Sequence, residues 1–516
     1  MSTNDQRPNF LIVMTDHQRA DTVLPEHPCI NPNLTEFAKE SVTFTDTYCS
    51  MAHCCPARAT FWSGLYPTRH GVWNNVNNEY AIQRGPHEHI RLFSQDLREA
   101  GYDLAYSGKW HVSAYGHQTP ANYGWRELGR YGEVIQDPWK KWEAIRKTAD
   151  RPDPEEAKIK MPGYRAHDLY GADEEGGAGD RRIMNRALEE LPALAEANRP
   201  WALFIGWNGP HAPYKIPQKY IDMYDSESIP LPPSFADEMA DKPDYYRKLR
   251  RSVFDQLGET GVREGIRHFW AYCTFLDEMF GEVLEALDKT GQADNTVVLY
   301  CSDHGDYAGD HGLFHKQVPS FLGAYNVPAV MRWPEGLQNP GRRVSELVSL
   351  ADFAPTFLEL ADLHPERYFT GRSLVPFLKD RTPEGWRDDM HAQCEGTENY
   401  FTQRQVFTKT HKYVYNGFGI DELYDLENDP HELVNLIDDP AHEEVKRDLV
   451  GRMWRFAYQE QDRLGATQYL MVNTAPWGPQ EGFRSPEGKA MPTAVPLGKE
   501  NDAEWVRRHR EGWQAQ

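Results

Sequence analysis

Four short apolar runs recur along the chain, and each one ends in polar or ionisable residues. They are NFLIVMTD (residues 9–16), YDLAYSGKWH (102–111), WALFIGWNGPH (201–211) and TVVLYCSDHGD (296–306). Runs that are short and nearly continuously apolar predict strands that are buried on both faces. A strand of this kind needs a packed layer on each side, so these runs constrain the fold more than any other feature.

An amphipathic segment lies between the last two runs. In GIRHFWAYCTFLDEMFGEVLEALDKTG (265–291) the apolar residues recur at helical spacing, and Gly291 is a stop signal. Strands that alternate with helices predict an α/β fold with a mostly parallel central sheet flanked by helices. Ligands bind at the carboxyl ends of the strands in such sheets, which is where all four runs carry their ionisable residues.

The pattern changes after about residue 380. RQVFTKTHKYVYNGFGIDELYDLENDP (404–430) alternates with turn residues, which predicts a small antiparallel sheet, and HEEVKRDLVGRMWRFAYQEQDRL (442–464) predicts a helix. We therefore expect a catalytic domain over residues 1–380 and a smaller C-terminal subdomain over 381–516. Its Pro- and Gly-rich tail, from Asn473 onward, is expected to wrap the surface or a neighbouring subunit of a homo-oligomer.

Composition excludes several partners. The chain has 56 Lys and Arg residues against 78 Asp and Glu residues, a net charge of −22, which argues against nucleic acid and anionic membranes as partners. No run approaches the roughly 18 apolar residues that span a bilayer, and the first residues lack the features of a signal peptide. Seven cysteines are too few for a disulfide framework, so we expect a cytoplasmic protein.

The strand ends carry two Asp-His pairs. Asp16 and His17 follow the first run, and Asp303 and His304 follow the last one, with Asp306 close behind. Two such pairs at one edge of a sheet can hold one divalent cation, for which carboxylates favour Ca²⁺ or Mg²⁺ and imidazoles favour Mn²⁺ or Zn²⁺. The alternative is that each Asp caps a following helix, but the matching positions of the two pairs favour the metal.

Cations and further histidines follow the same strands. Taken singly, each is more often a surface cation or a hydrogen-bonded core histidine, whereas together they predict a positive cavity for a tetrahedral anionic ester. The set comprises Arg58, Lys109, His111, His211, His311, His315 and Lys316.

One further stretch, MAHCCPARATFWSGLYPTRHG (51–71), contains the pattern C-x-P-x-R at Cys54, Pro56 and Arg58. It resembles the signature of the type I sulfatases, in the alkaline phosphatase superfamily. Six other stretches resemble family landmarks in family order and extend the likeness over about residues 8 to 436: PNFLIVMTD, NPNLTEFAKESVTFTDTYCS, GYDLAYSGKWH, NGPHAPY, SDHGDYAGDHGLFHK and LYDLENDPHELVNL.

The resemblance implies an alkaline-phosphatase-like fold and hydrolysis of sulfate monoesters. In this family a formylglycine-generating enzyme oxidises the first cysteine of the motif, here Cys54, to Cα-formylglycine, and Cys55 would be a passive small residue. A hydrated aldehyde suits the reaction, because one hydroxyl attacks sulfur and expels the alcohol. The second hydroxyl then loses its proton, and the hemiacetal collapses to release sulfate.

The family's roles carry over to matching positions. Asp16, His17, Asp303 and His304 would bind the metal, with formylglycine 54 completing the shell. His17 stands where many members have a second Asp and some phosphonate-hydrolysing relatives a Gln, which makes Mn²⁺ a candidate beside Ca²⁺. Arg58 is expected to hold the diol, and Lys109, His211 and Lys316 are expected to bind sulfate oxygens. His211 or Lys316 would assist the leaving oxygen, and His111 would take the proton of the second hydroxyl. Asp306, His311 and His315 are expected to be structural.

Three alternatives remain open from the sequence. The first is a phosphonate monoester hydrolase or phosphodiesterase, a branch that shares the formylglycine motif, although Lys109 and His111 in GKWH resemble the sulfatase form. The second is a non-catalytic protein that binds a metal or sulfated glycans. The third concerns the leaving group: 15 tryptophans could stack on sugar rings, which keeps oligosaccharide sulfates beside small alkyl or aryl sulfates.

Overall fold

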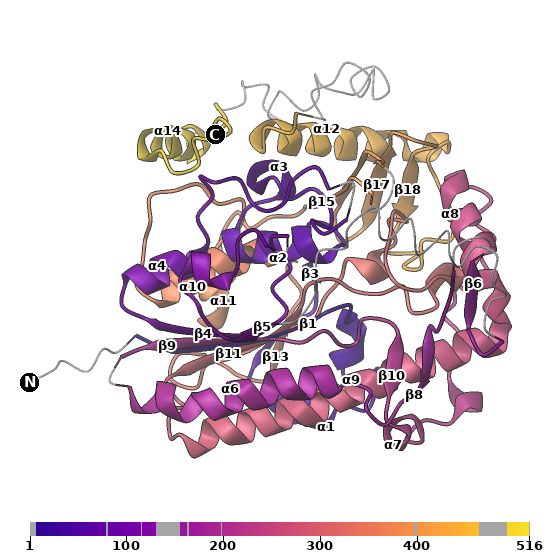
Figure 1. The fold of residues 1–516 in the computed structure, drawn as a ribbon. Helices are drawn as coiled ribbons and strands as arrows, with labels where there is room; N and C mark the ends of the chain where they lie inside the picture. The colour runs from indigo at the N-terminus through magenta and orange to yellow at the C-terminus, as the bar shows by residue number, and fades with distance from the viewer. Residues whose placement is uncertain are drawn as a thin grey trace, which may run out of the picture.

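A computed structural model describes residues 7–78, 81–114, 116–130, 155–161, 165–197, 199–396, 400–463 and 493–514. Its centre is an eight-stranded sheet (Figure 1) with the strand order β13 (Arg342–Val344), β2 (Val42–Phe44), β12 (Ala329–Arg332), β11 (Thr296–Ser302), β1 (Asn9–Thr15), β9 (Trp201–Gly206), β4 (Asp103–Gly108) and β5 (Arg126–Arg130). Strand β12 runs antiparallel to both of its neighbours, and the other pairs are parallel. The predicted α/β fold with a mostly parallel sheet is confirmed.

The four apolar runs form the adjacent strands β11, β1, β9 and β4, and nearly every one of their side chains is buried. Their carboxyl ends are level, because Thr15 pairs with Ser302, Met14 with Gly206, and Gly206 with Gly108. The residues that follow these strands therefore emerge at one edge of the sheet.

Helices cover both faces of the sheet (Figure 1). Helices α1 (Pro32–Lys39), α6 (Ala178–Glu196) and α9 (Gly258–Lys289) cover one face, and α2 (Cys54–Ser63), α4 (Phe93–Glu99) and α10 (Phe353–Leu360) cover the other. Helix α9 includes the segment predicted from apolar spacing but begins seven residues earlier, at Gly258. That first turn is polar, with Val262 as its first buried apolar residue, so it carries little of the periodic signal.

A four-stranded antiparallel sheet lies beside the core, formed by β15 (Met390–Cys394), β16 (Gln403–Phe407), β17 (His411–Asn416) and β18 (Glu422–Asp425). This confirms the predicted sheet and adds β15, which lies ahead of the predicted segment. Helix α12 (Glu443–Gln459) packs its apolar residues Leu449, Met453 and Trp454 against Val406 and Leu423 of this sheet. The boundary at residue 380 stays a prediction, and most of the expected tail lies outside the described residues.

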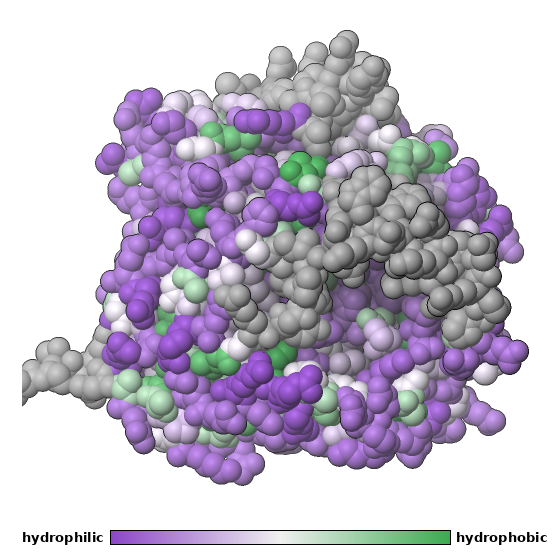
Figure 2. Space-filling model, in the orientation of Figure 1, coloured by the Kyte–Doolittle hydropathy of each residue, from purple (hydrophilic) through white to green (hydrophobic). Residues whose placement is uncertain are grey.

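The remaining helices and strands lie around these layers. They are β3 (Thr47–Tyr48), β6 (Ile159–Met161), β7 (Arg165–His167), β8 (Tyr170–Ala172), β10 (Tyr214–Ile216), β14 (Val348–Ser349), α3 (Pro67–His70), α7 (Gln218–Ile221), α8 (Asp244–Leu249), α11 (Val375–Leu378) and α14 (Ala503–Gln514). All seven cysteines are buried and free of disulfides. Within the described ranges, no helix combines the length and the apolar character needed to cross a membrane. The face shown in Figure 2 is largely hydrophilic, with scattered small apolar patches.

Candidate active site

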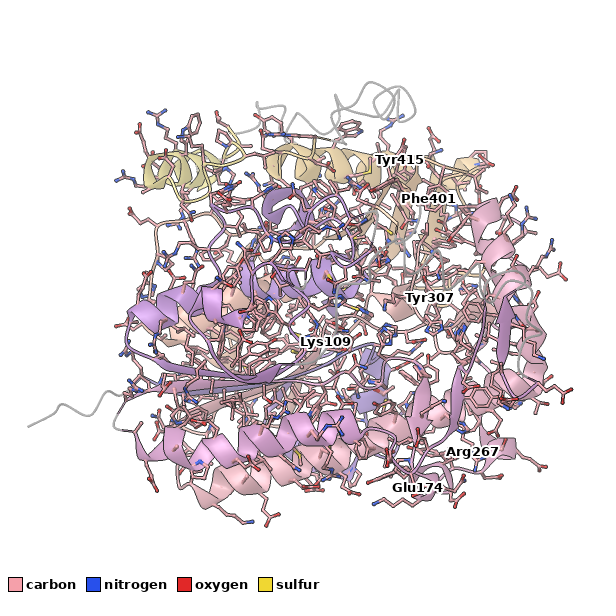
Figure 3. All side chains as sticks on the ribbon, viewed as in Figure 1. Lys109, Glu174, Arg267, Tyr307, Phe401 and Tyr415 are labelled. Atoms are coloured by element: carbon pink, nitrogen blue, oxygen red, sulfur yellow. The ribbon has the colours of Figure 1, made fainter. Side chains whose placement is uncertain are left out.

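The level strand ends bring together residues that are far apart in the sequence. Asp16 follows β1, Asp303 follows β11, and Lys109 follows β4. Backbone hydrogen bonds continue past the strands, from the Asp303 N–H to the Thr15 carbonyl and from the Lys109 N–H to the Gly206 carbonyl. Lys109 accordingly lies between helix α2 and the central sheet (Figure 3). Its ammonium forms an ion pair with the Asp16 carboxylate.

Cys54 is the first residue of helix α2, which places its thiol beside these strand ends. Its Sγ lies 3.3 Å from His304 Nε2, 3.6 Å from Asp16 Oδ1 and 3.6 Å from Lys316 Nζ. Pro56 is accommodated because it stands in the first turn, where its missing N–H costs no hydrogen bond. Arg58 follows Cys54 by four residues, so both side chains lie on one face of the helix.

Arg58 joins helix α2 to the sheet. Its Nε donates to Asp303 Oδ2 at 2.7 Å, and its Nη1 donates to the Lys109 carbonyl at 3.0 Å. The guanidinium and the carboxylates of Asp16 and Asp303 are completely buried. Buried charges are tolerated only when they are paired, so this interaction fixes the position of Cys54 relative to the strand ends.

Two overlapping groups of side chains have donor atoms close enough to hold one metal ion. The first comprises Asp16, Cys54, Asp303 and His304, and the second comprises Asp16, Cys54, His17 and His211, with donor atoms within 4.8 Å of one another in each group. His304 Nδ1 donates to the Gly305 carbonyl at 2.8 Å, which leaves its Nε2 lone pair facing Cys54. This buried set of carboxylates and imidazoles fits a divalent metal.

His17 is held by Asp306. Its backbone is left-handed, with a φ of 72°, and its Nδ1 donates to Asp306 Oδ2 at 3.0 Å. Asp306 also accepts hydrogen bonds from the Tyr214 hydroxyl at 2.8 Å and from the backbone N–H groups of Ala308 and His315. A carboxylate behind a metal-facing imidazole is the usual arrangement that orients a ligand.

Lys316 and His211 complete the positive side of the site. The Lys316 ammonium contacts His17 Nε2 and lies 3.4 Å from His211 Nε2. His211 comes from the loop after β9, whose backbone N–H groups at Asn208 and Gly209 donate to the buried carboxylate of Asp180. Asp180 and Tyr214 were not predicted as site residues, because each acts through contacts with distant parts of the chain.

The cations change the ionisation of the site. Burial and the Asp16 carboxylate favour the neutral thiol, but Lys109, Lys316 and the protonated form of His304 outweigh them and lower the pKa of Cys54 to about 5. Burial and the Lys316 ammonium lower the pKa of His211 to about 3. At neutral pH the site therefore presents an ionised Cys54, two ammonium groups and a neutral His211.

The remaining sequence candidates lie in different settings. His111 is half-buried two residues beyond Lys109, with a φ of 49°, and its role stays a prediction. His311 donates from Nδ1 to Asp237 and stacks on Phe321 at 3.5 Å, as a structural residue does. Of the 11 tryptophans whose burial the structure describes, seven are buried. Their number is therefore a weak indication of sugar binding.

Comparisons with known proteins agree with this geometry. A family model described as "Sulfatase" matches residues 8–363, and one described as "N-sulphoglucosamine sulphohydrolase, C-terminal" matches residues 309–459. A choline-sulfatase of Rhizobium meliloti is 30% identical, covering 84% of this chain and 83% of its own, and an uncharacterized sulfatase of Escherichia coli strain K12 is 27% identical, covering 92% and 91%. A phosphonate monoester hydrolase of Agrobacterium radiobacter has a similar fold, with a TM-score of 0.72 at 23% identity over 88% of this chain and 96% of its own.

The hydrogen bond between Asp306 and His17 leads to a prediction about metal affinity. We expect Asp306→Asn to weaken Mn²⁺ binding to the metal-free protein by about 10- to 100-fold, because the amide holds the imidazole less firmly than the carboxylate does. Calorimetric titration measures this affinity. Tyr214→Phe is the matched control, since it removes one donor to Asp306 and leaves the carboxylate in place. Unchanged affinity in Asp306→Asn would contradict the positioning role.

Proposed function

The chain belongs to the sulfatase family and is a sulfuric ester hydrolase, and we propose that its nucleophile is a formylglycine made from Cys54. The observation that carries the proposal is the position of Cys54: a buried thiol at the start of α2, within 3.6 Å of Asp16, His304 and Lys316. A hydrated formylglycine at this position would supply both the attacking hydroxyl and the hydroxyl whose deprotonation releases sulfate. We propose that a formylglycine-generating enzyme performs the conversion.

Lys109 and Lys316 are suited to hold the sulfate oxygens. Both ammonium groups are nearly buried, where a charge acts more strongly on a bound anion than it does in water. Asp16 neutralises Lys109, whereas Lys316 contacts only imidazoles and Cys54 in this cluster, and conversion of the ionised Cys54 to an uncharged formylglycine would remove the one negative charge beside it. Lys316 therefore supplies the larger share of the uncompensated positive charge.

The hydrogen bonds of His211 and Lys316 favour one of these two residues as the donor to the leaving oxygen. The Nδ1 of His211 donates to the Ala212 carbonyl at 2.6 Å, so the neutral ring has no hydrogen on Nε2, the atom that faces Lys316. His211 can accept at Nε2, and the Lys316 ammonium can donate. We therefore assign the donor to the leaving oxygen to Lys316, with His211 orienting that ammonium.

Arg58 has one guanidinium nitrogen left to donate to the hydrated aldehyde. Its Nε and Nη1 are used by Asp303 and the Lys109 carbonyl, while Nη2 makes no hydrogen bond with any described residue. A buried guanidinium N–H without an acceptor is costly, and an oxygen added at residue 54 would satisfy it. This supports the role of Arg58 in holding the diol.

We propose Asp16, His17, Asp303 and His304 as the residues that hold the metal, with Mn²⁺ preferred over Ca²⁺ because two of the four are imidazoles. A divalent metal supplies charge neutralisation and Lewis-acid polarisation of the sulfate group when it is bound. The substrate that we propose is a sulfate monoester of a sugar or a small alcohol. The phosphonate monoester hydrolase remains the alternative activity.

The adjacent cysteines provide a matched pair of variants. We expect Cys54→Ala to lower kcat for para-nitrophenyl sulfate by at least about 10³-fold, because it removes the nucleophile. Cys55→Ala should stay close to wild type, since the one hydrogen bond of its buried thiol with the described residues is accepted from the Val76 N–H. Equal loss in both variants would contradict the assignment. Faster hydrolysis of a phenyl phosphonate monoester than of the sulfate would support the alternative activity.

The imidazole of His17 leads to a prediction about metal choice. After removal of bound metal with a chelator, we expect Mn²⁺ to restore more sulfatase activity than Ca²⁺ does. In His17→Asp, which replaces a nitrogen donor by a hard oxygen donor, Ca²⁺ should gain relative to Mn²⁺. The ratio of the two restored kcat values measures the effect. An identical ratio in both proteins would show that His17 does not contact the metal.

A further inference from the structure

A second cavity lies away from Cys54, where the core meets the C-terminal elements. Its volume is about 780 Å³, within the range of small-molecule sites. The wall is formed by residues 367–372 of the core, by residues 387–391 at the start of the antiparallel sheet, and by helices α12 and α14. Figure 1 shows α12 and α14 side by side at the top of the molecule, above α3.

The cavity is rich in arginine. Among the described residues, six arginines line it, against two carboxylates: Arg367, Arg372, Arg387, Arg452, Arg455 and Arg510, with Asp389 and Glu460. The net charge of the whole protein is −22, so this excess of positive charge is local to the cavity. A concentration of one sign of charge against the overall balance attracts ligands of the opposite sign.

Both acidic side chains of the cavity are already engaged. Asp389 pairs with Arg452 at 3.1 Å and with His391 at 3.5 Å. Glu460 is buried and accepts from the Tyr368 hydroxyl at 2.6 Å, from Thr370 at 2.8 Å and from Arg69 at 3.4 Å. Neither carboxylate is therefore free to neutralise a further guanidinium.

Three of the arginines are also paired, and three are not. Arg367 binds Asp96, Arg387 binds Asp352, and Arg452 binds Asp388, Asp389 and Asp448. In the described part of the chain, Arg372, Arg455 and Arg510 form no ion pair. Arg455 is half-buried, whereas Arg372 and Arg510 are exposed and therefore partly screened by water. A bound anion would still offset the repulsion among these like charges.

The planar shape of the guanidinium groups indicates which anions can bind in the cavity. A guanidinium forms paired hydrogen bonds with the oxygens of sulfate, phosphate or carboxylate. The three unpaired arginines come from three separate segments of the wall, and a ligand that pairs with more than one of them through separate anionic groups carries at least two such groups. The lining also includes a stacked pair of rings, His391 and Phe456, whose centroids are 4.0 Å apart.

The cavity is separate from the catalytic centre. Among its residues is Tyr66, which lies past the C-terminal end of helix α2, whereas Cys54 is the first residue of that helix. The ten residues of α2 span about 15 Å. We propose that this cavity is a second binding site, which takes a small organic molecule carrying at least two sulfate, sulfonate, phosphate or carboxylate groups.

Calorimetric titration of the metal-loaded enzyme tests the proposal. The probes are ethanedisulfonate, fructose bisphosphate and succinate, which distinguish sulfonate, phosphate and carboxylate as the recognised group. We expect at least one probe to bind wild type, and its affinity to fall about tenfold or more in the double variant Arg455→Gln/Arg510→Gln, since charge-assisted hydrogen bonds are lost.

Matched controls lie on the same two helices. Arg447 on α12 and Arg507 on α14 are exposed and do not line the cavity, so Arg447→Gln/Arg507→Gln makes the same change of charge outside it. This control should bind the probe like wild type, and both double variants should keep wild-type turnover of para-nitrophenyl sulfate. The proposal is overturned if none of the probes binds wild type. It is equally overturned if the two double variants bind alike.

Discussion

The structure depends on the burial of two carboxylates, Asp16 and Asp303, at the level ends of two neighbouring strands. Buried carboxylates must be paired, and the partners come from different elements: Arg58 from helix α2 and Lys109 from the end of β4. The same pairing that satisfies these charges therefore fixes α2 against the sheet. Cys54, at the start of α2, is placed by this arrangement rather than by contacts of its own.

The cations around Cys54 serve two purposes. Lys109 offsets the charge of Asp16, and Lys316 is held among His17, His211 and Cys54, whose negative charge would be lost on conversion to formylglycine. An uncompensated ammonium in a buried site is costly in the free protein and favourable when a sulfate ester binds. The fold thus places this positive charge before the anion binds, which contributes to the affinity for the anion.

Much of this architecture could be predicted from local sequence patterns. The runs that form β1, β4, β9 and β11 are nearly continuously apolar, and α9 shows helical spacing. These two patterns predict a buried central sheet with helices packed on it. Strand β15 was missed because it lies outside the segment with a clear alternating pattern. Helix α9 begins earlier than predicted because its first turn lacks apolar residues.

The site residues also divide into those that a local sequence pattern indicates and those that it does not. Residues that follow the strands, such as Asp16, Lys109 and Asp303, were found because parallel strands end at one edge. The positioning residues were harder to identify, since Asp306 contacts His17 across 289 positions and Asp180 holds a loop 28 residues later. Such contacts depend on packing and leave no local pattern. The roles assigned to His111 and the other site residues rest on the family resemblance and on the proposal above.

We propose that Cys54, and not Cys55, becomes formylglycine, and peptide mass spectrometry is the direct test. Digestion with trypsin releases residues 40–58, which contain both cysteines. Replacement of the thiol by an aldehyde makes this peptide about 18 Da lighter. We expect fragmentation to assign the whole loss of mass to Cys54. An intact thiol at Cys54 in an active enzyme, or a loss placed at Cys55, would contradict it.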